Sequence, residues 1–376
     1  MFLFLLDPAM FFSILVAYVL GMLVMVVAAQ VIAPKLAGKV SGKLSLRASM
    51  ALLGLVIVVG GLAGILVLLS ILGLFTNPYA VSGLALHILI VVLLMNVVIY
   101  LISPWIINAS YGARHDPELQ RMVDEVARRS GVKPPKAVVV DGPPNAFAYG
   151  NFLAGRWVAV SSELLRMARE DELEAVIGHE IGHHRHADNA VMLFMGLVPS
   201  FLYYLGLLLI RTSFYYSAMS SENRRGGGGV FFLIAGAAAI VFSFVIQILV
   251  LAFSRLREYY ADAHGASVTS PTSMQRALAR LHVYYRYNRS AAHEIAQSKL
   301  KALFIYAFTN AVADPLYPFY GRTPRPREVR DVDIDEVVER LKKVEASEPG
   351  EFLSSHPPIP KRIRFLEGLK VLRERY

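Results

Sequence analysis

Long uncharged apolar stretches dominate the hydrophobic pattern along this chain of 376 residues. No Asp, Glu, Lys or Arg occurs between Arg47 and Arg114, and residues 189–210 and 226–254 are also free of charge. A mainly apolar, uncharged stretch of about 18 residues or more predicts a membrane-spanning helix. We therefore expect five spans, at residues 9–33, 48–75, 85–108, 190–210 and 230–253.

Two features of the apolar pattern set the number of spans. The long run after Arg47 is expected to hold two helices, because "TNPYAVSG" at residues 76–83 contains the Asn, Pro and Gly of a turn. The first stretch resembles a signal peptide in its position, but "MFLFLLDPAMFF" has no basic region and the apolar stretch is too long. The pattern therefore favours a first span.

Basic residues in the short loops predict the orientation of the spans. The loop "PKLAGKVSGKLSLR" at residues 34–47 has four basic residues and no acidic one, so we expect it to be cytoplasmic. The N-terminus is then outside, and the charged block from Arg114 is inside. The loop between the last two spans contains Arg211, Arg224 and Arg225 and runs against this rule. We expect a multi-pass plasma-membrane protein.

The polar part of the chain forms two blocks with different patterns. In the first block, the pattern predicts an amphipathic helix at residues 116–131 and strands at 136–141 and 156–161, with a turn-rich connection between the strands. Two helices are expected to follow, and the second of them contains a histidine cluster. The second block looks mainly helical, with helices expected at about 272–288, 291–309, 333–346 and 360–373.

Composition excludes several classes of site. Charged residues make up 18% of the chain and the mean hydropathy is +0.47, as expected for a protein embedded in a lipid bilayer. The net charge of +9 is explained by cytoplasmic loops facing an anionic leaflet, and no module that binds nucleic acid is evident. The absence of cysteine excludes disulfides, cysteine ligands and a cysteine nucleophile.

The motif H-E-x-x-H, formed by His179, Glu180 and His183, predicts a metal site. Residues four apart lie on one face of a helix, with their Cβ atoms about 5–6 Å apart, so two imidazoles can converge on one ion. Glu180 lies one step around the helix, where it can reach a water at the metal without occupying a coordination position. A catalytic zinc ion needs three protein ligands and one open position, so a third ligand is required.

The neighbouring histidines are weak candidates for the third ligand. His186 lies about 10 Å from His179 along the helix axis, which is too far for one unbroken helix to bring both to the ion of His183. The metzincin arrangement requires Gly at position 186 and His at 189, and the chain has His and Asn there. His184 points about 100° away from His183 around the helix. We therefore interpret His184 and His186 as bystanders.

A better candidate lies in "SRLREYYADAHGA", residues 254–266, which follow the last span. Glu258 and Asp262 are four residues apart, so Glu258 could bind the metal while Asp262 accepts the N–H of a ligand imidazole. The alternative is a surface helix on which these carboxylates pair with Arg255 and Arg257. A hairpin of the last two spans would bring this segment and the H-E-x-x-H helix to one membrane face, which favours the metal site.

The sequence resembles the HtpX and CAAX-prenyl-protease family of membrane zinc endopeptidases, of the gluzincin group. The matching pieces are "NAFAYG" (145–150), "HEIGHHRHAD" (179–188), "SRLREYYAD" (254–262) and "SSHPPIPKRI" (354–363). The resemblance implies one Zn2+ per chain, with roles for eight residues: ligands His179, His183 and Glu258, general base Glu180, Asp262 as partner of a ligand histidine, His356 and Arg362 near the oxyanion or substrate backbone, and Asn145 in substrate binding.

The expected fold is a mainly α membrane protein with about five transmembrane helices and a cytoplasmic zincin-like α+β catalytic domain that carries a small sheet. Residues 1–108 would form three spans, 109–188 the catalytic block with the sheet and H-E-x-x-H helix, 189–254 a transmembrane hairpin, and 255–376 a helical block. HtpX-type enzymes usually have two spans before the catalytic block and CAAX prenyl proteases seven in all. The short chain favours the HtpX side.

The predicted function is a zinc endopeptidase that hydrolyses misfolded or damaged membrane proteins at the cytoplasmic face. An extended substrate could pair with the strand at about 156–160 if this is an edge strand. A CAAX-type prenyl-protein protease is the alternative within the class. A transporter or a non-catalytic zinc-binding membrane protein is the alternative of another class, but the spans contain no Asp, Glu, Lys or Arg, and their polar residues are uncharged ones such as His87, Asn96 and Gln30.

Overall fold

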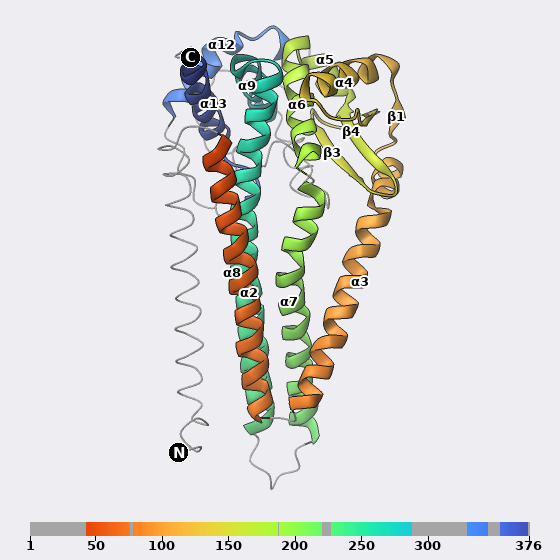
Figure 1. The fold of residues 1–376 in the computed structure, drawn as a ribbon, viewed down its shortest axis with the longest axis vertical. Helices are drawn as coiled ribbons and strands as arrows, with labels where there is room; N and C mark the ends of the chain where they lie inside the picture. The colour runs from red at the N-terminus through yellow and green to blue at the C-terminus, as the bar shows by residue number, and fades with distance from the viewer. Residues whose placement is uncertain are drawn as a thin grey trace. The chain divides into compact units, whose positions relative to one another are not determined.

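The structure, a computed structural model, describes residues 43–75, 78–186, 188–219, 227–287, 329–344 and 354–374 (Figure 1). The protein is mainly helical, with one small sheet, as predicted. The predicted span at residues 9–33 and the predicted helix at 291–309 lie outside the described residues.

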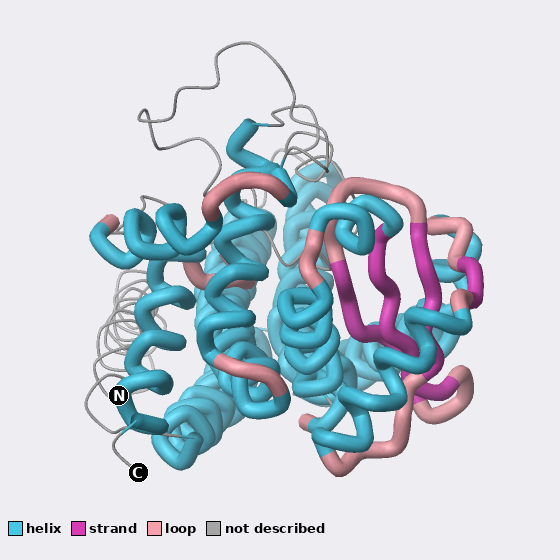
Figure 2. Tube along the Cα trace, turned by 90° about the horizontal axis from the view of Figure 1, so that it is seen from above, coloured by secondary structure: helices cyan, strands magenta, loops and turns pink. Residues whose placement is uncertain are grey.

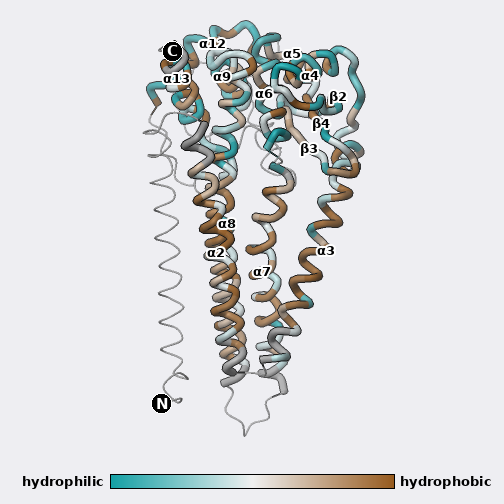
Figure 3. The backbone as a smooth tube through the Cα atoms, viewed as in Figure 1, coloured by the Kyte–Doolittle hydropathy of each residue, from teal (hydrophilic) through white to brown (hydrophobic). Residues whose placement is uncertain are grey.

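Four helices of the described residues are long and apolar enough to cross a membrane: α2 (Lys43–Phe75), α3 (Pro78–Ser110), α7 (Asp188–Met219) and α8 (Gly227–Val268). Their apolar segments are Ala48–Ser70, Gly83–Ser110, Ala190–Tyr215 and Gly229–Val268, which correspond to four of the five predicted spans. Figure 3 shows the apolar residues along most of these segments. Large hydrophobic side chains such as Leu66 and Leu94 are exposed, as expected of helices that face lipid.

The chain divides into two compact units, and the first contains residues Ala48–Ile99 and Met192–Phe253. Within it, α7 and α8 approach closely at Gly206 and Gly236. A Cβ added at Gly206 would lie 2.8 Å from the carbonyl oxygen of Gly236. Small residues at such crossings let two apolar helices pack backbone to backbone, and the Ser243 hydroxyl donates to the carbonyl of Pro199 at 2.7 Å. The predicted hairpin of the last two spans is therefore packed as a pair.

The second unit contains Tyr100–Val191 and Ser254–Tyr376 and carries the sheet. Its strands, β1 (Arg114–His115), β2 (Lys136–Val140), β3 (Ala146–Asn151) and β4 (Gly155–Ser161), lie side by side in the order β1-β2-β4-β3 (Figure 2). β2 and β4 are parallel, and both outer pairs are antiparallel. The prediction that the strand at 156–160 is an edge strand is wrong, because β4 lies between β2 and β3. The edge strand beside it is β3, whose sequence was interpreted as a connection.

The two faces of the sheet pack against different helices. Side chains such as Val158 and Val160 join the main core with helix α4 (Pro117–Ser130) and helix α6 (Glu170–Arg185). Phe147 and Tyr149 of β3 point to the other face and pack with Ile107 at the end of α3. This alternation is the period of two expected for a strand, and it positions the sheet beside α6.

The helix ends follow local signals in the sequence. The Asp116 side chain accepts from the backbone amides of Glu118 and Leu119 and so caps α4. Gly131 ends this helix with φ of 65°, in the left-handed region that glycine adopts without strain. Ser161 caps the short helix α5 (Ser162–Met167) by accepting from the amide of Leu164.

Of the remaining described helices of the second unit, one packs against α6 and the other two pack against that helix and against each other. They are α9 (Pro271–Tyr287), α12 (Ile334–Lys343) and α13 (Ile359–Glu374). Glu172 on α6 and Arg280 on α9 form a fully buried ion pair with distances of 2.6 and 2.7 Å. Arg280 also donates to the carbonyl of Val329 at 2.8 Å. This pair joins three segments that are far apart in the sequence.

Candidate metal centre

Glycines allow α6 and the end of α8 to approach closely where the motif residues lie. A Cβ added at Gly178 would lie 3.1 Å from the Cα of Gly265, and one at Gly182 would lie 3.3 Å from the Cα of Ala261. A Cβ at Gly265 would lie only 2.6 Å from the carbonyl oxygen of Ala175. Any larger residue at these positions would separate the two helices. The close approach is what brings α8 carboxylates to α6 imidazoles.

His179, His183 and Glu258 offer three ligand atoms that all lie within 4.8 Å of one another. The Nε2 atoms of the two histidines are 3.2 Å apart, and each lies 3.6 Å from an oxygen of Glu258. Ligands at 2.0–2.1 Å from a tetrahedral zinc ion are about 3.3 Å apart. The spacing of these three donors therefore fits a tetrahedral metal site with one position left for another ligand.

Two further observations support a cation at this position. Glu258 is 4% exposed, and its Oε2 atom accepts no hydrogen bond from the described residues, although His179 Nε2 lies 3.6 Å away and Arg362 Nη1 lies 3.7 Å away. Burying a carboxylate oxygen without a hydrogen bond is costly, and a cation bound directly to it offsets that cost. Burial lowers the pKa of His179, but hydrogen bonds to Asp262 and Glu258 outweigh it and raise that pKa to about 10. The site therefore stabilises positive charge, and the donors fit a divalent metal ion.

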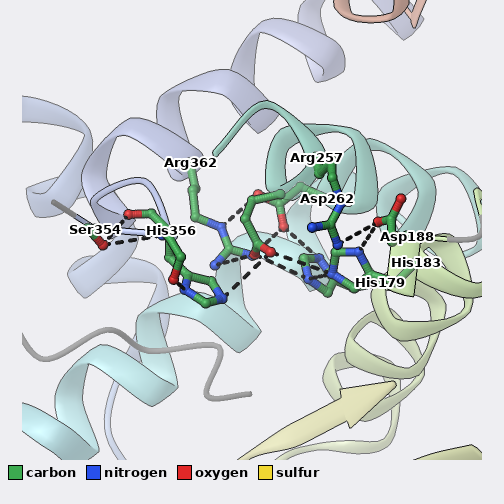
Figure 4. Close-up of polar contacts among 10 residues, drawn as sticks. His179, His183, Asp188, Arg257, Asp262, Ser354, His356 and Arg362 are labelled. Atoms are coloured by element: carbon green, nitrogen blue, oxygen red, sulfur yellow. Dashed lines mark hydrogen bonds and ion pairs between the residues drawn. The ribbon is translucent and has the colours of Figure 1, made fainter. Parts of the chain in front are cut away.

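Asp262 lies where the sequence predicted a partner for a ligand histidine. Its Oδ1 atom is 2.9 Å from Nδ1 of His179 (Figure 4). Arg362 on α13 holds the same carboxylate with two hydrogen bonds, of 2.8 Å from Nε and 2.6 Å from Nη2. Asp262 and Arg362 are both completely buried. This contact fixes the imidazole of His179 with Nε2 directed at the other donors.

The second histidine has an equivalent partner, Asp188, that was not among the residues predicted from the sequence. Oδ2 of Asp188 lies 2.6 Å from Nδ1 of His183, and Arg257 holds that oxygen at 2.9 Å (Figure 4). Helix α6 ends at Arg185 and α7 begins at Asp188, so the two helices are separate elements. The first residue of α7 thus lies beside His183. An aspartate five residues after the second motif histidine was the available signal.

The alternative of a mixed-charge surface helix at residues 254–266 does not hold. Arg257 pairs with Asp188, and Arg255 donates to the carbonyl of Ser354 at 2.7 Å. Both arginines are buried, as are the two carboxylates with which they were expected to pair.

Glu180 is buried beside the donor set, with 2% of its surface exposed. Burial raises the pKa of its carboxyl group, against opposing effects of His179 and His183. The backbone amide of Ala148 hydrogen-bonds to this carboxylate and favours its charged form. Because Ala148 belongs to β3, the edge strand of the sheet among the described residues, Glu180 lies along that edge.

His356 precedes α13 and faces the same donors. Its Nε2 atom lies 3.6 Å from Oε1 of Glu258, and its Nδ1 lies 2.9 Å from the hydroxyl of Ser355. Ser354 fixes the loop, because its hydroxyl donates to the carbonyl of His356 at 2.8 Å (Figure 4). Burial lowers the pKa of His356 to about 4, so the ring is neutral near pH 7. The structure thus brings the late His and Arg motif to the metal site.

The other singled-out residues lie outside the donor set. His184 is buried and its Nε2 lies 2.8 Å from the carbonyl of Trp157, so it ties α6 to strand β4. His186 packs edge-on against Tyr260 with ring centroids 4.2 Å apart. Asn145 is buried before β3, where its backbone amide donates to the Ser161 hydroxyl at 2.9 Å.

Comparison with known proteins finds one peptidase family and several curated proteases that this chain resembles. The family model described as Peptidase family M48 matches residues 113–370. The "Protease HtpX homolog" of Archaeoglobus fulgidus is 48% identical over 353 residues, which cover 94% of this chain and 96% of that protein. Its namesake from Pyrobaculum calidifontis is 49% identical over 355 residues, with the same coverage. The crystal structure of S. mikatae Ste24p aligns with a TM-score of 0.46 at 17% identity, covering 86% of this chain and 67% of that one.

Proposed function

The chain belongs to peptidase family M48 and is a multi-pass membrane metallopeptidase, and on this premise we propose that it is a zinc endopeptidase that cleaves unfolded membrane proteins at the cytoplasmic face. The observation that carries the proposal is the donor triad of His179, His183 and Glu258 with Glu180 beside it. The resemblance to HtpX-type proteases, predicted from the motifs, is confirmed.

Zinc is the metal that this donor set favours. Two imidazoles and one carboxylate, with the fourth position open, are typical ligands of a catalytic zinc ion. The separations of 3.2 to 3.6 Å between their donor atoms match those of ligands around a tetrahedral ion. When bound, zinc supplies a Lewis acid that polarises the scissile carbonyl and acidifies the attacking water. Asp262 and Asp188 accept from the Nδ1 atoms of the two histidines and so hold both Nε2 atoms toward the ion.

Glu180 is proposed as the general base. Its carboxylate takes a proton from the attacking water and then delivers it to the leaving amine, and a raised pKa suits a group that must hold the proton between these steps. We propose that the Ser355 hydroxyl, 2.9 Å from Nδ1 of His356, donates to it, so that the neutral ring carries its proton on Nε2 and donates to the developing oxyanion. Arg362 is completely buried on Asp262, so we assign it a positioning role.

Strand β3 is proposed to bind the substrate. It is an edge strand, and Ala148 on it contacts Glu180, so a peptide paired with β3 in extended form would pass the general base. Only an unfolded segment can pair in this way, which supports unfolded proteins as the substrate class. The four basic residues at 34–47 support a cytoplasmic location of the catalytic residues.

The proposal is tested with the full chain purified in detergent and a fluorescent unfolded casein as substrate. We expect Glu180→Gln to retain one zinc per chain by metal analysis and to lose proteolysis by about a hundredfold or more. Glu170→Gln is the matched control, because Glu170 is exposed on the same helix. A chelator should abolish cleavage, and added zinc should restore it. Cleavage by Glu180→Gln at the control rate would refute the mechanism, and preference for a short prenylated peptide would favour the CAAX-type alternative.

A further inference from the structure

The turn between β3 and β4 exposes two large apolar side chains. Phe152 is 79% exposed and Leu153 is 61% exposed. Outside the four long apolar helices, the described residues expose only two other large hydrophobic side chains by more than a third, Val344 at 37% and Val371 at 43%. The apolar tip of this hairpin is therefore unusual for the catalytic part of the chain, and it has no explanation in the metal site.

One buried side chain both shapes this turn and attaches it to helix α3. Oδ1 of Asn151 accepts from the backbone amides of Leu153 at 2.9 Å and Ala154 at 2.8 Å, which closes the turn. Nδ2 of the same residue donates to the carbonyls of Tyr100 and Leu101, each at 2.8 Å. Asn151 is only 7% exposed, so its side chain makes these contacts from a buried position.

A proline in α3 makes the carbonyl of Tyr100 available. In a regular helix that oxygen accepts from the amide four residues later, but Pro104 occupies this position and has no N–H. The carbonyl accepts instead from Asn151 and from the hydroxyl of Ser103, at 2.9 Å. An apolar helix can carry such a break within a bilayer only where another group satisfies the backbone. Asn151 supplies that group.

The attachment point lies at membrane depth along α3. The uncharged segment Gly83–Ser110 has 28 residues, or about 42 Å of helix, against about 30 Å for the hydrocarbon core of a bilayer. Even if the whole excess of about 12 Å lay at the Ser110 end, the hydrocarbon boundary would fall about eight residues before Ser110. Tyr100 and Leu101 are therefore at or inside that boundary, and the hairpin tip attached to them is at the same level.

The surroundings of the tip match a lipid interface. The exposed side chains of Ile102, Trp105 and Ile106 continue the apolar surface on α3 itself. The exposed Arg156 follows the turn and can reach phosphate groups of lipids. A cavity of about 250 Å³ lies beside the tip, and its lining includes Phe152, Arg156 and His183. The tip thus forms part of the rim of the cavity that reaches the metal site.

We propose that the β3–β4 turn, with Phe152 and Leu153, inserts into the interface of the lipid bilayer. The inserted turn places the edge strand β3 next to the membrane, where a segment leaving the bilayer would meet it first. The inference rests on the contacts of Asn151 and on exposure, and it stands whether or not the chain cleaves unfolded proteins.

The absence of cysteine from the chain allows a direct test. Leu153→Cys is labelled with a nitroxide in the full chain, which is reconstituted in vesicles of phosphatidylcholine and phosphatidylglycerol. Collision of the label with oxygen, which concentrates in lipid, is compared with collision with a water-soluble nickel chelate. Leu94→Cys on α3 is the lipid control, and Arg128→Cys on α4 is the water control, because both side chains are exposed. We expect the label at 153 to behave as at 94.

Two results would overturn the proposal. Accessibility of the label at 153 to the nickel chelate equal to that at 128 would place the turn in water. Protection from both reagents would mean that a protein surface, from a second copy or another chain, covers the tip. Asn151→Ala in the labelled chain should increase the mobility of the nitroxide, because the turn loses its attachment to α3. Unchanged mobility would remove the structural basis of the proposal.

Discussion

The close approach of Gly265 to α6 predicts that a single methyl group at this position weakens metal binding. In Gly265→Ala, the added Cβ would lie 2.6 Å from the carbonyl oxygen of Ala175 and 3.1 Å from the amide nitrogen of His179. Ordinary contacts of this kind begin at about 3.4 Å, so α6 and α8 must separate by roughly 0.8 Å. Both clashing atoms are backbone, so no side-chain rotation relieves them.

This displacement is large compared with what a metal site tolerates. Ligand distances in such sites hold to within about 0.2 Å, and α6 carries two donors while α8 carries the third. We therefore expect Gly265→Ala to bind zinc at least about tenfold more weakly. Overpacking should also cost about 1–3 kcal/mol of folding stability. The loss of affinity comes from moving Glu258 relative to the two histidines.

The assay is competition for zinc between the purified chain and a chromogenic chelator, with thermal unfolding followed in parallel with and without the metal. Gly368→Ala is the matched control, because Gly368 lies within α13 and an added Cβ there would meet no atom within 4 Å. This control should keep its zinc affinity, and its helix should gain up to about 1 kcal/mol. Zinc affinity of Gly265→Ala within about twofold of the control would refute the reasoning.

Two further predictions concern buried carboxylates. Asp188→Asn should weaken zinc binding by about 10–100-fold in the same chelator competition, because His183 loses the acceptor that orients it, whereas the exposed Asp141→Asn should not change it. An unchanged affinity would show that Asp188 has no positioning role. Glu172→Gln should destabilise the fold by about 3–5 kcal/mol in thermal unfolding, because it leaves Arg280 as a buried charge without its counterion. A loss no greater than that of the exposed Glu170→Gln would contradict this.

The apolar pattern was sufficient to predict the long helices, because a bilayer requires length and absence of charge and little else. The donor triad could also be predicted from spacing and order. A spacing of four residues places two side chains on one face of a helix, and the two segments that carry the donors lie directly before and after the predicted hairpin. The edge strand β3 was not predictable in this way. Its short "AFAYGN" sequence becomes a strand through pairing with β4 and through packing of Phe147 and Tyr149 on Ile107, which are contacts distant in sequence.

The roles of several polar residues could not be predicted, because they depend on where helices end and where elements cross. The hydrophobic periodicity of the sequence does not determine either. Asp188 reaches His183 only because α6 stops at Arg185, and a model of one continuous helix would direct it elsewhere. His184 was interpreted as a bystander, and its contact with the carbonyl of Trp157 depends on the position of β4. Asn151 lies in a sequence typical of a turn, but the carbonyls to which it donates are about 50 residues earlier in the chain. One of them, that of Tyr100, is available only because Pro104 has no N–H.

Helix α6 has no exposed side over the two turns that lead into the motif and contain its first histidine and its glutamate. Every residue from Ala175 to Gly182 is buried, with glycines against α8, Ile181 in the core and the motif side chains at the metal site. In a surface helix, every third or fourth residue is exposed and can be substituted at little cost. This stretch has no such position. A substitution in this stretch therefore requires compensating changes in the residues that contact it. A protein that keeps the motif must also keep the packing around it.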